Sequence, residues 1–343
     1  MSLLEVRDLC VDFTIGERPV RALDNVSFDV GEGEIVGLVG ESGCGKSTIG
    51  RALLRLLPNN ARLTGGSVVF RREELTKLSD RAFRKIRWKH LAVIFQDTMN
   101  VLDPVYKVGD AISEALRTHD SKLSKADAWK RARELLSMVG IDEDRVRSYP
   151  HELSGGMKQR ICTAMAMSLE PDLIIADEPT TALDVIVQDG ILRKILAKQR
   201  EKGRSMILIS HDVGIIGEMC DRVIVMYAGR VVELGPIRSI FHEASHPYTL
   251  GLKAAIPRLL GEGELISIPG SPPALTSRTE GCDFALRCPF AQDVCLAKPP
   301  WVEVGPDHFE LCHFPEMAPE FREKIGSPEI WGTVRHRLEE TRV

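Results

Sequence analysis

Short apolar runs alternate with amphipathic segments through the first two thirds of the chain. The apolar runs have the length and composition of buried strands and lie at 34–39, 65–70, 91–96, 173–176 and 206–210. The amphipathic segments place apolar residues three and four positions apart, as helices that pack on a core do, at 49–57, 111–116 and 126–139. Strands that alternate with helices in this way predict an α/β fold with a mostly parallel sheet.

The residues before and after these alternating segments show other patterns of apolar and polar positions. Residues 1–33 alternate between apolar and polar with turns at 16–19 and 31–33, which predicts antiparallel strands. Val223–Tyr227 and Arg230–Glu233, joined at Ala228-Gly229, predict a hairpin. Residues 257–316 are rich in Pro and Gly, and a last helix is expected from Ser327-Pro328, with Ile330, Val334 and Leu338 on one face.

These patterns predict a core domain at 1–240, with an inserted helical subdomain at about 97–165, and a loop-rich extension at 241–343. The composition bears on which functions the protein can have. The net charge of -4 gives no basic excess of the kind that nucleic-acid binding needs. No apolar segment approaches the roughly 20 residues that span a bilayer, so we expect a cytosolic chain whose membrane role would come through a partner.

The stretch Gly40-Glu41-Ser42-Gly43-Cys44-Gly45-Lys46-Ser47-Thr48 matches G-x-x-x-x-G-K-[ST] between a predicted strand and a predicted helix. In that context backbone N–H groups and a helix N-terminus converge on one point and suit a polyanion such as a nucleotide. Lys46 would add a charge on the β- and γ-phosphates, and the Ser47 hydroxyl would bind Mg²⁺. The sequence therefore predicts a site for a nucleoside triphosphate.

A second helix start of the same kind lies at Leu153-Ser154-Gly155-Gly156-Met157-Lys158-Gln159. Ser154 is a natural N-cap, and the glycines Gly155 and Gly156 let backbone amides approach an anion closely. Since the chain has a single lysine-bearing P-loop, the simplest geometry gives this second start to a nucleotide held by another subunit.

Polar residues follow several of the predicted strands, at the edge where open α/β sheets place ligands. Asp177 is placed to hold Mg²⁺ or its water shell, and Glu178 to accept a proton from the water that attacks the γ-phosphate. Gln96 could position this water or bind Mg²⁺, and His211 could contact the γ-phosphate. Phe13 could stack on an adenine, or it could be an ordinary core aromatic of its strand.

These motifs, in this order, resemble those of ABC-transporter ATP-binding subunits, and the likeness covers about residues 3–240. Gly40–Thr48 is similar to the Walker A motif, Gln96 to the Q-loop and Leu153–Gln159 to the ABC signature, with Met157 where many members have Gln. Leu173–Glu178 resembles Walker B, Thr181–Asp184 the D-loop, and His211 the switch histidine, and Phe13 falls at the adenine-stacking position.

The resemblance implies a head-to-tail dimer with two ATP molecules, each held between one P-loop and the opposite signature. It implies as partners a second ATPase subunit, either a related chain or a second copy, two transmembrane permease subunits and, indirectly, a solute-binding protein. The chain would then lie peripherally at the cytoplasmic side of the membrane and would not bind nucleic acid. Because Asp177, Glu178 and His211 are all present, we expect a site that hydrolyses ATP.

Residues beyond the cassette resemble those of dipeptide, oligopeptide and nickel importers. The similar stretches are His246–Thr249, Pro269–Pro273, Gly281-Cys282 and Arg287-Cys288-Pro289. Within the cassette, Phe95-Gln96-Asp97 also resembles these importers, with Thr98 in place of the usual Pro. Peptide import is the first expectation, with import of nickel or an oligosaccharide as the alternative. A soluble ABC ATPase acting on nucleic acid or the ribosome is disfavoured, because the 56 residues between Gln96 and the signature leave no room for long coiled coils.

Of the eight cysteines, Cys282, Cys288, Cys295 and Cys312 gather in the last fifth of the chain. A cytosolic protein should not depend on disulfides, so a shared metal could help to hold a loop-rich region folded. Zinc is one alternative, but no C-x-x-C spacing is present, and free buried thiols are another. Four cysteines also suit a [4Fe–4S] cluster, which the resemblance favours, with His308 and His313 as alternative ligands.

Overall fold

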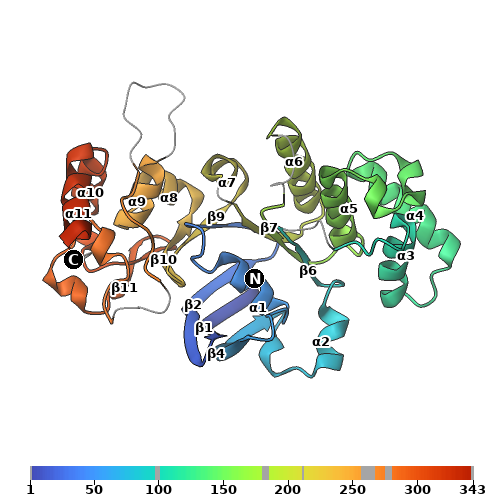
Figure 1. Cartoon of the computed structure of the whole chain (residues 1–343), viewed down its shortest axis with the longest axis horizontal. Helices are drawn as coiled ribbons and strands as arrows, with labels where there is room; N and C mark the ends of the chain where they lie inside the picture. The colour runs from blue at the N-terminus through green and yellow to red at the C-terminus, as the bar shows by residue number, and fades with distance from the viewer. Residues whose placement is uncertain are drawn as a thin grey trace. The chain divides into compact units, whose positions relative to one another are not determined.

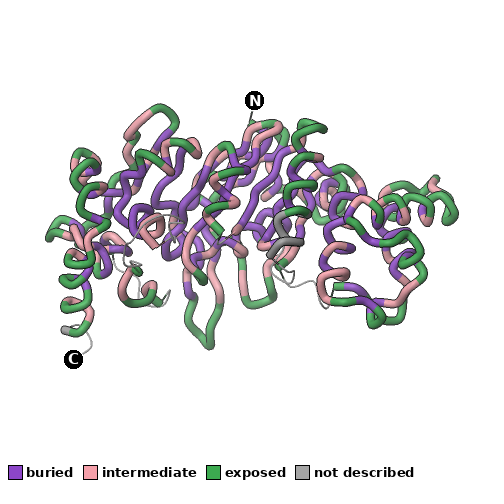
Figure 2. The backbone as a smooth tube through the Cα atoms, turned by 90° about the horizontal axis from the view of Figure 1, so that it is seen from above, coloured by how far each residue is buried: buried purple, intermediate pink, exposed green. Residues whose placement is uncertain are grey.

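The structure of the protein is a computed structural model that describes residues 2–96, 101–179, 185–210, 212–255, 267–274 and 280–340. The chain forms two compact units and enters each of them more than once. Figure 1 labels the helices and strands along the chain. Unit 1 holds residues 1–4, 30–35 and 69–209, and unit 2 holds residues 5–29, 36–68 and 210–343. Buried residues follow the strands, and exposed residues follow turns and outer helix faces (Figure 2). None of the described helices is both long and apolar enough to cross a membrane.

The first sheet of unit 2 has the strand order β2-β1-β4. β1 (Ser2–Ile15) and β2 (Arg18–Gly31) are joined by a short turn at Gly16, which makes them antiparallel and confirms the strands predicted for residues 1–33. β4 (Ala61–Phe70) begins earlier than the predicted run at 65–70, and its end pairs with the short strand β5 (Glu73–Glu74).

The second sheet of unit 2 contains the strand that leads into the P-loop. β3 (Ile35–Val39) pairs in parallel with β9 (Arg222–Tyr227), and β9 pairs antiparallel with β10 (Arg230–Pro236). The predicted hairpin is therefore confirmed. Helix α7 (Val213–Met219) packs so closely on β3 that a Cβ atom at Gly37 would lie 2.8 Å from the Cγ2 atom of Ile216, so this strand position requires glycine.

Part of the extension joins this same sheet, which the sequence pattern does not predict. β12 (His308–Leu311) pairs antiparallel with β10, and β11 (Trp301–Gly305) pairs antiparallel with β12. Residues 301–311 thus continue the sheet that contains β3. The domain boundary at residue 240 stays a prediction.

Unit 1 contains three parallel strands in the order β6 (Leu91–Ile94), β7 (Leu173–Asp177) and β8 (Ser205–Ile209). Its helices are α2 (Asp80–Ile86), α3 (Val108–His119), α4 (Lys125–Met138), α5 (Gly155–Met167) and α6 (Val185–Glu201). α3, α4 and α5 share a core that includes Ile112, Leu136 and Ile161. The predicted parallel strands and helical segments of this region are confirmed.

The end of the chain is helical in unit 2. α8 (Ile237–Glu243) packs on β9 and β10. α9 (Pro247–Ala254), α10 (Ala318–Lys324) and α11 (Pro328–Glu340) meet around fully buried Phe321 and Trp331. α11 begins at the predicted Pro328 and packs Ile330, Val334 and Leu338 on this core, as expected. Short 3₁₀ helices lie at Leu75–Lys77, Glu143–Arg147, Pro150–Glu152, Ala285–Arg287, Asp293–Leu296 and Pro315–Met317.

A fully buried carboxylate holds α9 and β12 against β10. Glu233 on β10 accepts hydrogen bonds from the Ser245 amide (2.8 Å) and from the His246 amide (3.3 Å), and its Oε1 lies 2.8 Å from Nε2 of His308. Burial opposes the charge on Glu233, but these contacts outweigh it and lower the pKa of the carboxyl. The ionised side chain therefore fixes the start of α9, which carries Tyr248 toward the P-loop.

His246 caps α9 only while it is neutral, because its Nδ1 atom accepts a hydrogen bond from the Tyr248 amide at 3.1 Å. Burial lowers the pKa of His246 to about 4, from an ordinary value of 6.5. A depressed folded-state pKa adds stability that is present above pH 6.5 and is lost as the pH falls toward 4.

We therefore expect His246 to account for about 2 kcal/mol of stability lost between pH 7 and pH 5. The variant His246→Asn keeps a good N-cap residue, does not titrate in this range and should show a smaller loss. Urea unfolding at both pH values measures the difference. His336→Asn, at an exposed position of α11, is the matched control, and equal losses in all three proteins would contradict the prediction.

Candidate nucleotide-binding site

The P-loop joins β3 to α1 (Lys46–Leu53) within unit 2. Gly40, Gly43 and Gly45 have φ angles of 149°, 79° and 105°, which L side chains rarely adopt. A Cβ atom at Gly40 would also lie 2.2 Å from the carbonyl oxygen of Met226. The spacing of the glycines therefore reflects the loop conformation itself. The helix after the loop ends at Leu53, four residues before the predicted end, and Arg55 beyond it has a φ of 52°.

The first turn of α1 is open to an anion. Its N-cap is Gly45, no side chain caps it, and it contains no acidic residue. Free N–H groups and the positive end of the helix dipole favour a phosphate at such a terminus. Ser47 and Thr48 are half-buried in this turn, and Ser42 and Gly43 are exposed on the loop.

The side chain of Lys46 is held in place by carbonyl groups of the P-loop. Its Nζ atom donates to the carbonyl oxygens of Gly40 (2.7 Å) and Glu41 (2.9 Å), and the residue is only 8% exposed. An ammonium that is already largely removed from water gives up little further hydration when a phosphate replaces these carbonyls.

Cys44 can face a phosphate only through its backbone. The side chain is buried, and burial raises the pKa of its thiol. Its amide donates to the Glu41 carbonyl at 3.3 Å, and its carbonyl accepts from the Gly229 amide at 2.9 Å. Phe13 is half-buried on β1 in the same unit, which leaves both of its predicted roles open.

The predicted catalytic carboxylates lie in unit 1 at the end of β7. Asp177 is the last residue of the strand and is buried, and Glu178 follows it with a φ of 44°. This left-handed backbone is rare for a residue with a side chain and directs the strand into a sharp turn. The Glu178 amide donates to the Ile209 carbonyl at 3.0 Å, which ties the turn to β8.

Gln96 and Glu178 are brought together. The Nε2 atom of Gln96 donates to Oε2 of Glu178 at 2.6 Å, although 82 residues separate them in sequence. With Nε2 facing the carboxylate, the amide Oε1 is the Gln96 atom that could face a cation. The predicted placement of both side chains at strand ends is consistent with this contact.

The signature helix has the predicted start. The hydroxyl of Ser154 accepts from the Met157 amide at 3.3 Å and caps α5, while Gly155 and Gly156 form its first turn. No acidic residue lies in that turn, so this terminus also suits an anion. His211, residues 97–100 and the predicted D-loop residues 181–184 lie outside the described residues.

The four late cysteines gather in one part of unit 2. Cys288, Cys295 and Cys312 are buried, and the Cys282 amide donates to the Cys295 carbonyl at 2.9 Å. Burial, with a smaller effect of the neighbouring thiols, raises the pKa of Cys282 to about 11 and that of Cys288 well above its usual value. Among the described residues no group of three or more His, Cys, Asp or Glu side chains converges closely enough to hold a metal ion. His308 instead lies against Glu233, and His313 against the Ala297 carbonyl.

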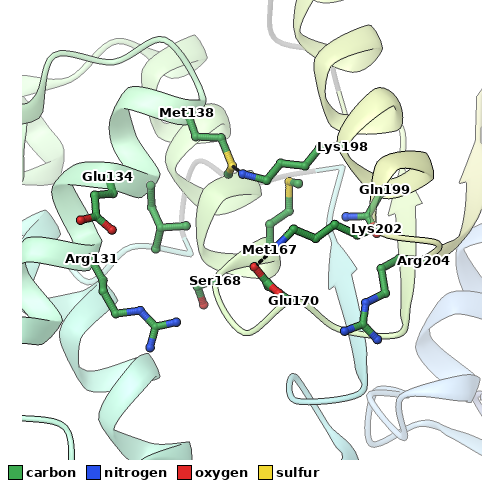
Figure 3. A pocket seen from close by; sticks show the side chains of 11 residues that line it. Arg131, Glu134, Met138, Met167, Ser168, Glu170, Lys198, Gln199, Lys202 and Arg204 are labelled. Carbon is green, nitrogen blue, oxygen red and sulfur yellow. Dashed lines mark hydrogen bonds and ion pairs between the residues drawn. The ribbon is translucent and has the colours of Figure 1, made fainter.

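A separate cavity of about 180 Å³ lies in unit 1 between α4, α5 and α6 (Figure 3). Its charged side chains include the ion pair of Lys202 with Glu170, and the Nζ atom of Lys198 lies 2.9 Å from the sulfur of Met138. None of the predicted site residues lines it. The cavity is thus distinct from the P-loop.

A glycine loop between a parallel strand and an uncapped helix defines a P-loop nucleotide-binding protein. A family model described as "ABC transporter" matches residues 23–181, and one described as "Oligopeptide/dipeptide transporter, C-terminal region" matches residues 232–295. The chain belongs to the ABC transporter family, as an ATPase whose C-terminal region is of the oligopeptide/dipeptide transporter type.

Several known proteins are similar over most of the chain. A probable peptide ABC transporter ATP-binding protein, y4tR, of Sinorhizobium fredii is 46% identical over 90% of this chain and 94% of its own. The dipeptide transport ATP-binding protein DppD of Bacillus subtilis is 47% identical over 86% of this chain and 89% of its own. A solved dimeric ATP-binding cassette, MJ0796, bound to ADP and Pi has a TM-score of 0.63 and 28% identity, covering 68% of this chain and 99% of that one.

Proposed function

We propose that this protein is the ATP-hydrolysing subunit of an ABC importer for dipeptides or oligopeptides. The observation that carries the proposal is the match of residues 232–295 to the C-terminal region of oligopeptide/dipeptide transporters, in a chain whose first part matches an ABC cassette. Relatives named for peptide and dipeptide transport extend this likeness over most of the chain.

The proposed mechanism begins with ATP at the P-loop of unit 2. Backbone amides of residues 42–45 and the open start of α1 would surround the phosphates, and Lys46 would exchange its two carbonyl contacts for phosphate oxygens. Mg²⁺, when bound, would neutralise charge on the β- and γ-phosphates, and the Ser47 hydroxyl and the amide oxygen of Gln96 are donors of the type that it prefers. Phe13 is proposed to stack on the adenine.

Glu178 is the proposed general base. Its carboxylate would accept the proton of the attacking water, and the contact with Gln96 would hold that carboxylate in one orientation. Asp177, buried beside it, would orient the water shell of Mg²⁺. His211 is proposed to contact the γ-phosphate.

A second ATPase subunit, either a copy of this chain or a related one, is proposed to complete each site. Ser154 and the amides of Gly155 and Gly156 would bind the ATP of that partner, and the absence of an acidic residue from the first turn of α5 allows this. The dimeric state of the similar cassette supports this arrangement. ATP bound by both subunits would favour the closed dimer, and hydrolysis would release it. Two permease subunits would hold the pair at the cytoplasmic side of the membrane, with a solute-binding protein on the other side.

Uptake measurements test the transport role. Vesicles that contain this chain, its permease partners and the solute-binding protein should accumulate a labelled dipeptide or oligopeptide when ATP is enclosed on the side of the ATPase. Competition by nickel or an oligosaccharide, without competition by peptides, would overturn the assignment of the solute. ATP hydrolysis that no solute stimulates would overturn the transport role itself.

The four cysteines are proposed to hold an iron–sulfur cluster. Four soft thiol donors in a buried, loop-rich region support it. Among the described residues these thiols do not converge closely enough to hold a metal ion, so the proposal rests on the number and the softness of the donors. Protein purified without oxygen should therefore be brown and contain iron, and Cys288→Ser should lose both the colour and the iron. A colourless preparation that contains zinc would contradict the cluster.

A further inference from the structure

The loop that carries the first two of these cysteines reaches the P-loop. Arg287, one residue before Cys288, forms a two-pronged ion pair with Glu41, the residue after Gly40: the Nη1–Oε2 distance is 2.6 Å and the Nη2–Oε1 distance is 2.8 Å. The side chain of Arg287 is 3% exposed and that of Glu41 is 24% exposed. This contact joins the extension to the phosphate-binding loop within unit 2.

Arg287 is held in place independently of Glu41. Its Nε atom donates to the Pro269 carbonyl at 2.9 Å, its Nη2 atom to the Gly270 carbonyl at 3.3 Å, and its Nη1 atom to the Tyr227 hydroxyl at 3.2 Å. These bonds fix the guanidinium plane, so Glu41 meets a rigid partner and not a mobile surface arginine.

Both the side chain and the backbone of Glu41 are engaged. Its amide donates to the Tyr248 hydroxyl at 2.8 Å, and its carbonyl accepts from Nζ of Lys46 at 2.9 Å. The rings of Tyr248 and Tyr227 pack at an interplanar angle of 57° with centroids 4.6 Å apart, and Phe284 makes edge contacts with both rings. A rigid aromatic cluster and a rigid guanidinium therefore hold the residue whose carbonyl contacts the phosphate-binding lysine.

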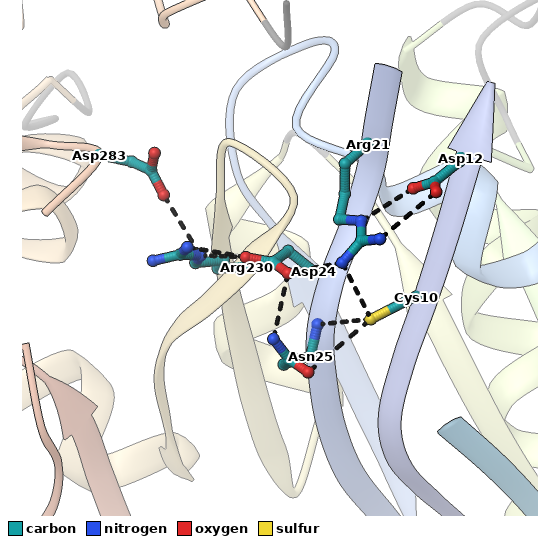
Figure 4. Close-up of polar contacts among 7 residues, drawn as sticks. All are labelled: Cys10, Asp12, Arg21, Asp24, Asn25, Arg230 and Asp283. Carbon is teal, nitrogen blue, oxygen red and sulfur yellow. Dashed lines mark hydrogen bonds and ion pairs between the residues drawn. The ribbon is translucent and has the colours of Figure 1, made fainter. Parts of the chain in front are cut away.

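The same loop makes a second ionic contact that touches no P-loop residue. Asp283 lies 3.4 Å from Nε of Arg230, and Arg230 in turn lies 2.7 Å from Asp24 on β2 (Figure 4). Asp24, Asn25 and Arg21 continue this network to Cys10 and Asp12 on β1. The Asp283 contact anchors the extension elsewhere and thus provides an internal control.

We propose that Arg287 is a positioning residue for ATP binding, which acts by fixing Glu41 and through it the P-loop. A loop with three glycines in left-handed conformations loses much backbone freedom when it is ordered around a phosphate. An anchor that orders the loop beforehand removes part of that cost and raises ATP affinity. The inference rests on ATP binding at the P-loop and does not depend on the transported solute.

ATP affinity of the full-length protein tests the proposal, measured with Mg²⁺ present for Glu41→Gln, Arg287→Gln, the double variant and Asp283→Asn. Each of the first two should raise the Kd for ATP about tenfold, and the double variant should add little more, because the two residues act through one contact. Asp283→Asn should stay within about twofold, because its contact does not include the P-loop. Hydrogen exchange of the amides at residues 41–45 should speed up in Arg287→Gln and not in Asp283→Asn.

Glu41→Gln keeps the size of the side chain and leaves Arg287 its other acceptors, so it remains informative if Arg287→Gln does not fold. Wild-type ATP affinity in a folded Glu41→Gln protein would overturn the proposal. Additive losses of affinity in the double variant would also overturn the proposal, and so would a loss in Asp283→Asn equal to that in Arg287→Gln. Either result would mean that Arg287 and Glu41 affect ATP binding only through the overall stability of the protein.

Discussion

Glu178→Gln is expected to reduce steady-state ATP hydrolysis by roughly 10²–10⁴-fold, the range usual for loss of a general base, while ATP still binds. In the native protein the Nε2 atom of Gln96 lies 2.6 Å from the Glu178 carboxylate. Glutamine has almost the same shape as glutamate and can still contact Gln96, so the turn after β7 should persist. The variant would lack the oxygen that is proposed to take the proton of the attacking water. The protein should therefore accumulate bound ATP and, if the proposed dimer forms, stay in its closed state.

Phosphate release and nucleotide retention measure this effect together. Glu114→Gln, at an exposed position of α3, makes the same chemical change away from the motifs and should hydrolyse ATP normally. Undiminished phosphate release by Glu178→Gln would refute its role as the base. Loss of both hydrolysis and ATP binding would instead point to a structural fault in the turn.

Lys46→Ala is expected to weaken ATP binding by about 100-fold or more, because roughly 3 kcal/mol of charge-assisted hydrogen bonding to phosphate disappears. The lysine is 8% exposed and held by the Gly40 and Glu41 carbonyls, so it is oriented before ATP arrives. Lys46→Arg should not restore binding, since a branched guanidinium does not fit the place of an ammonium among those carbonyls.

Equilibrium binding of ATP, and of ADP for comparison, measures the effect of Lys46. The loss should be larger for ATP, which carries the γ-phosphate. Lys85→Ala, at an exposed position of α2, removes the same charge elsewhere and should bind ATP as the native chain does. Equal affinity of Lys46→Ala and the native chain would exclude the proposed contact with phosphate.

Features set by nearby residues could be predicted from the sequence. The P-loop, the cap Ser154, and the buried strands β6, β7 and β8 depend on local glycine conformations, capping residues and apolar runs, and all are present. The inward face of α11 was likewise visible in its spacing.

Contacts between distant segments could not be predicted in this way. Arg287 and Glu41 are 246 residues apart, and neither their charge nor their spacing distinguishes them from surface residues. The pairing of β12 with β10 was missed because β12 is short and carries Glu310 directly opposite Glu233, where an apolar residue would have revealed a buried strand.

The pairing of β12 with β10 bears on how this protein can be divided. A chain shortened at residue 240 would leave β10 with a row of unpaired backbone amides and carbonyls along its outer side, and would expose the buried Glu233. Such a fragment presents a ready template for strand addition by other molecules. We therefore expect the ATP-binding part of this protein to depend on residues 308–311 of the extension for its solubility.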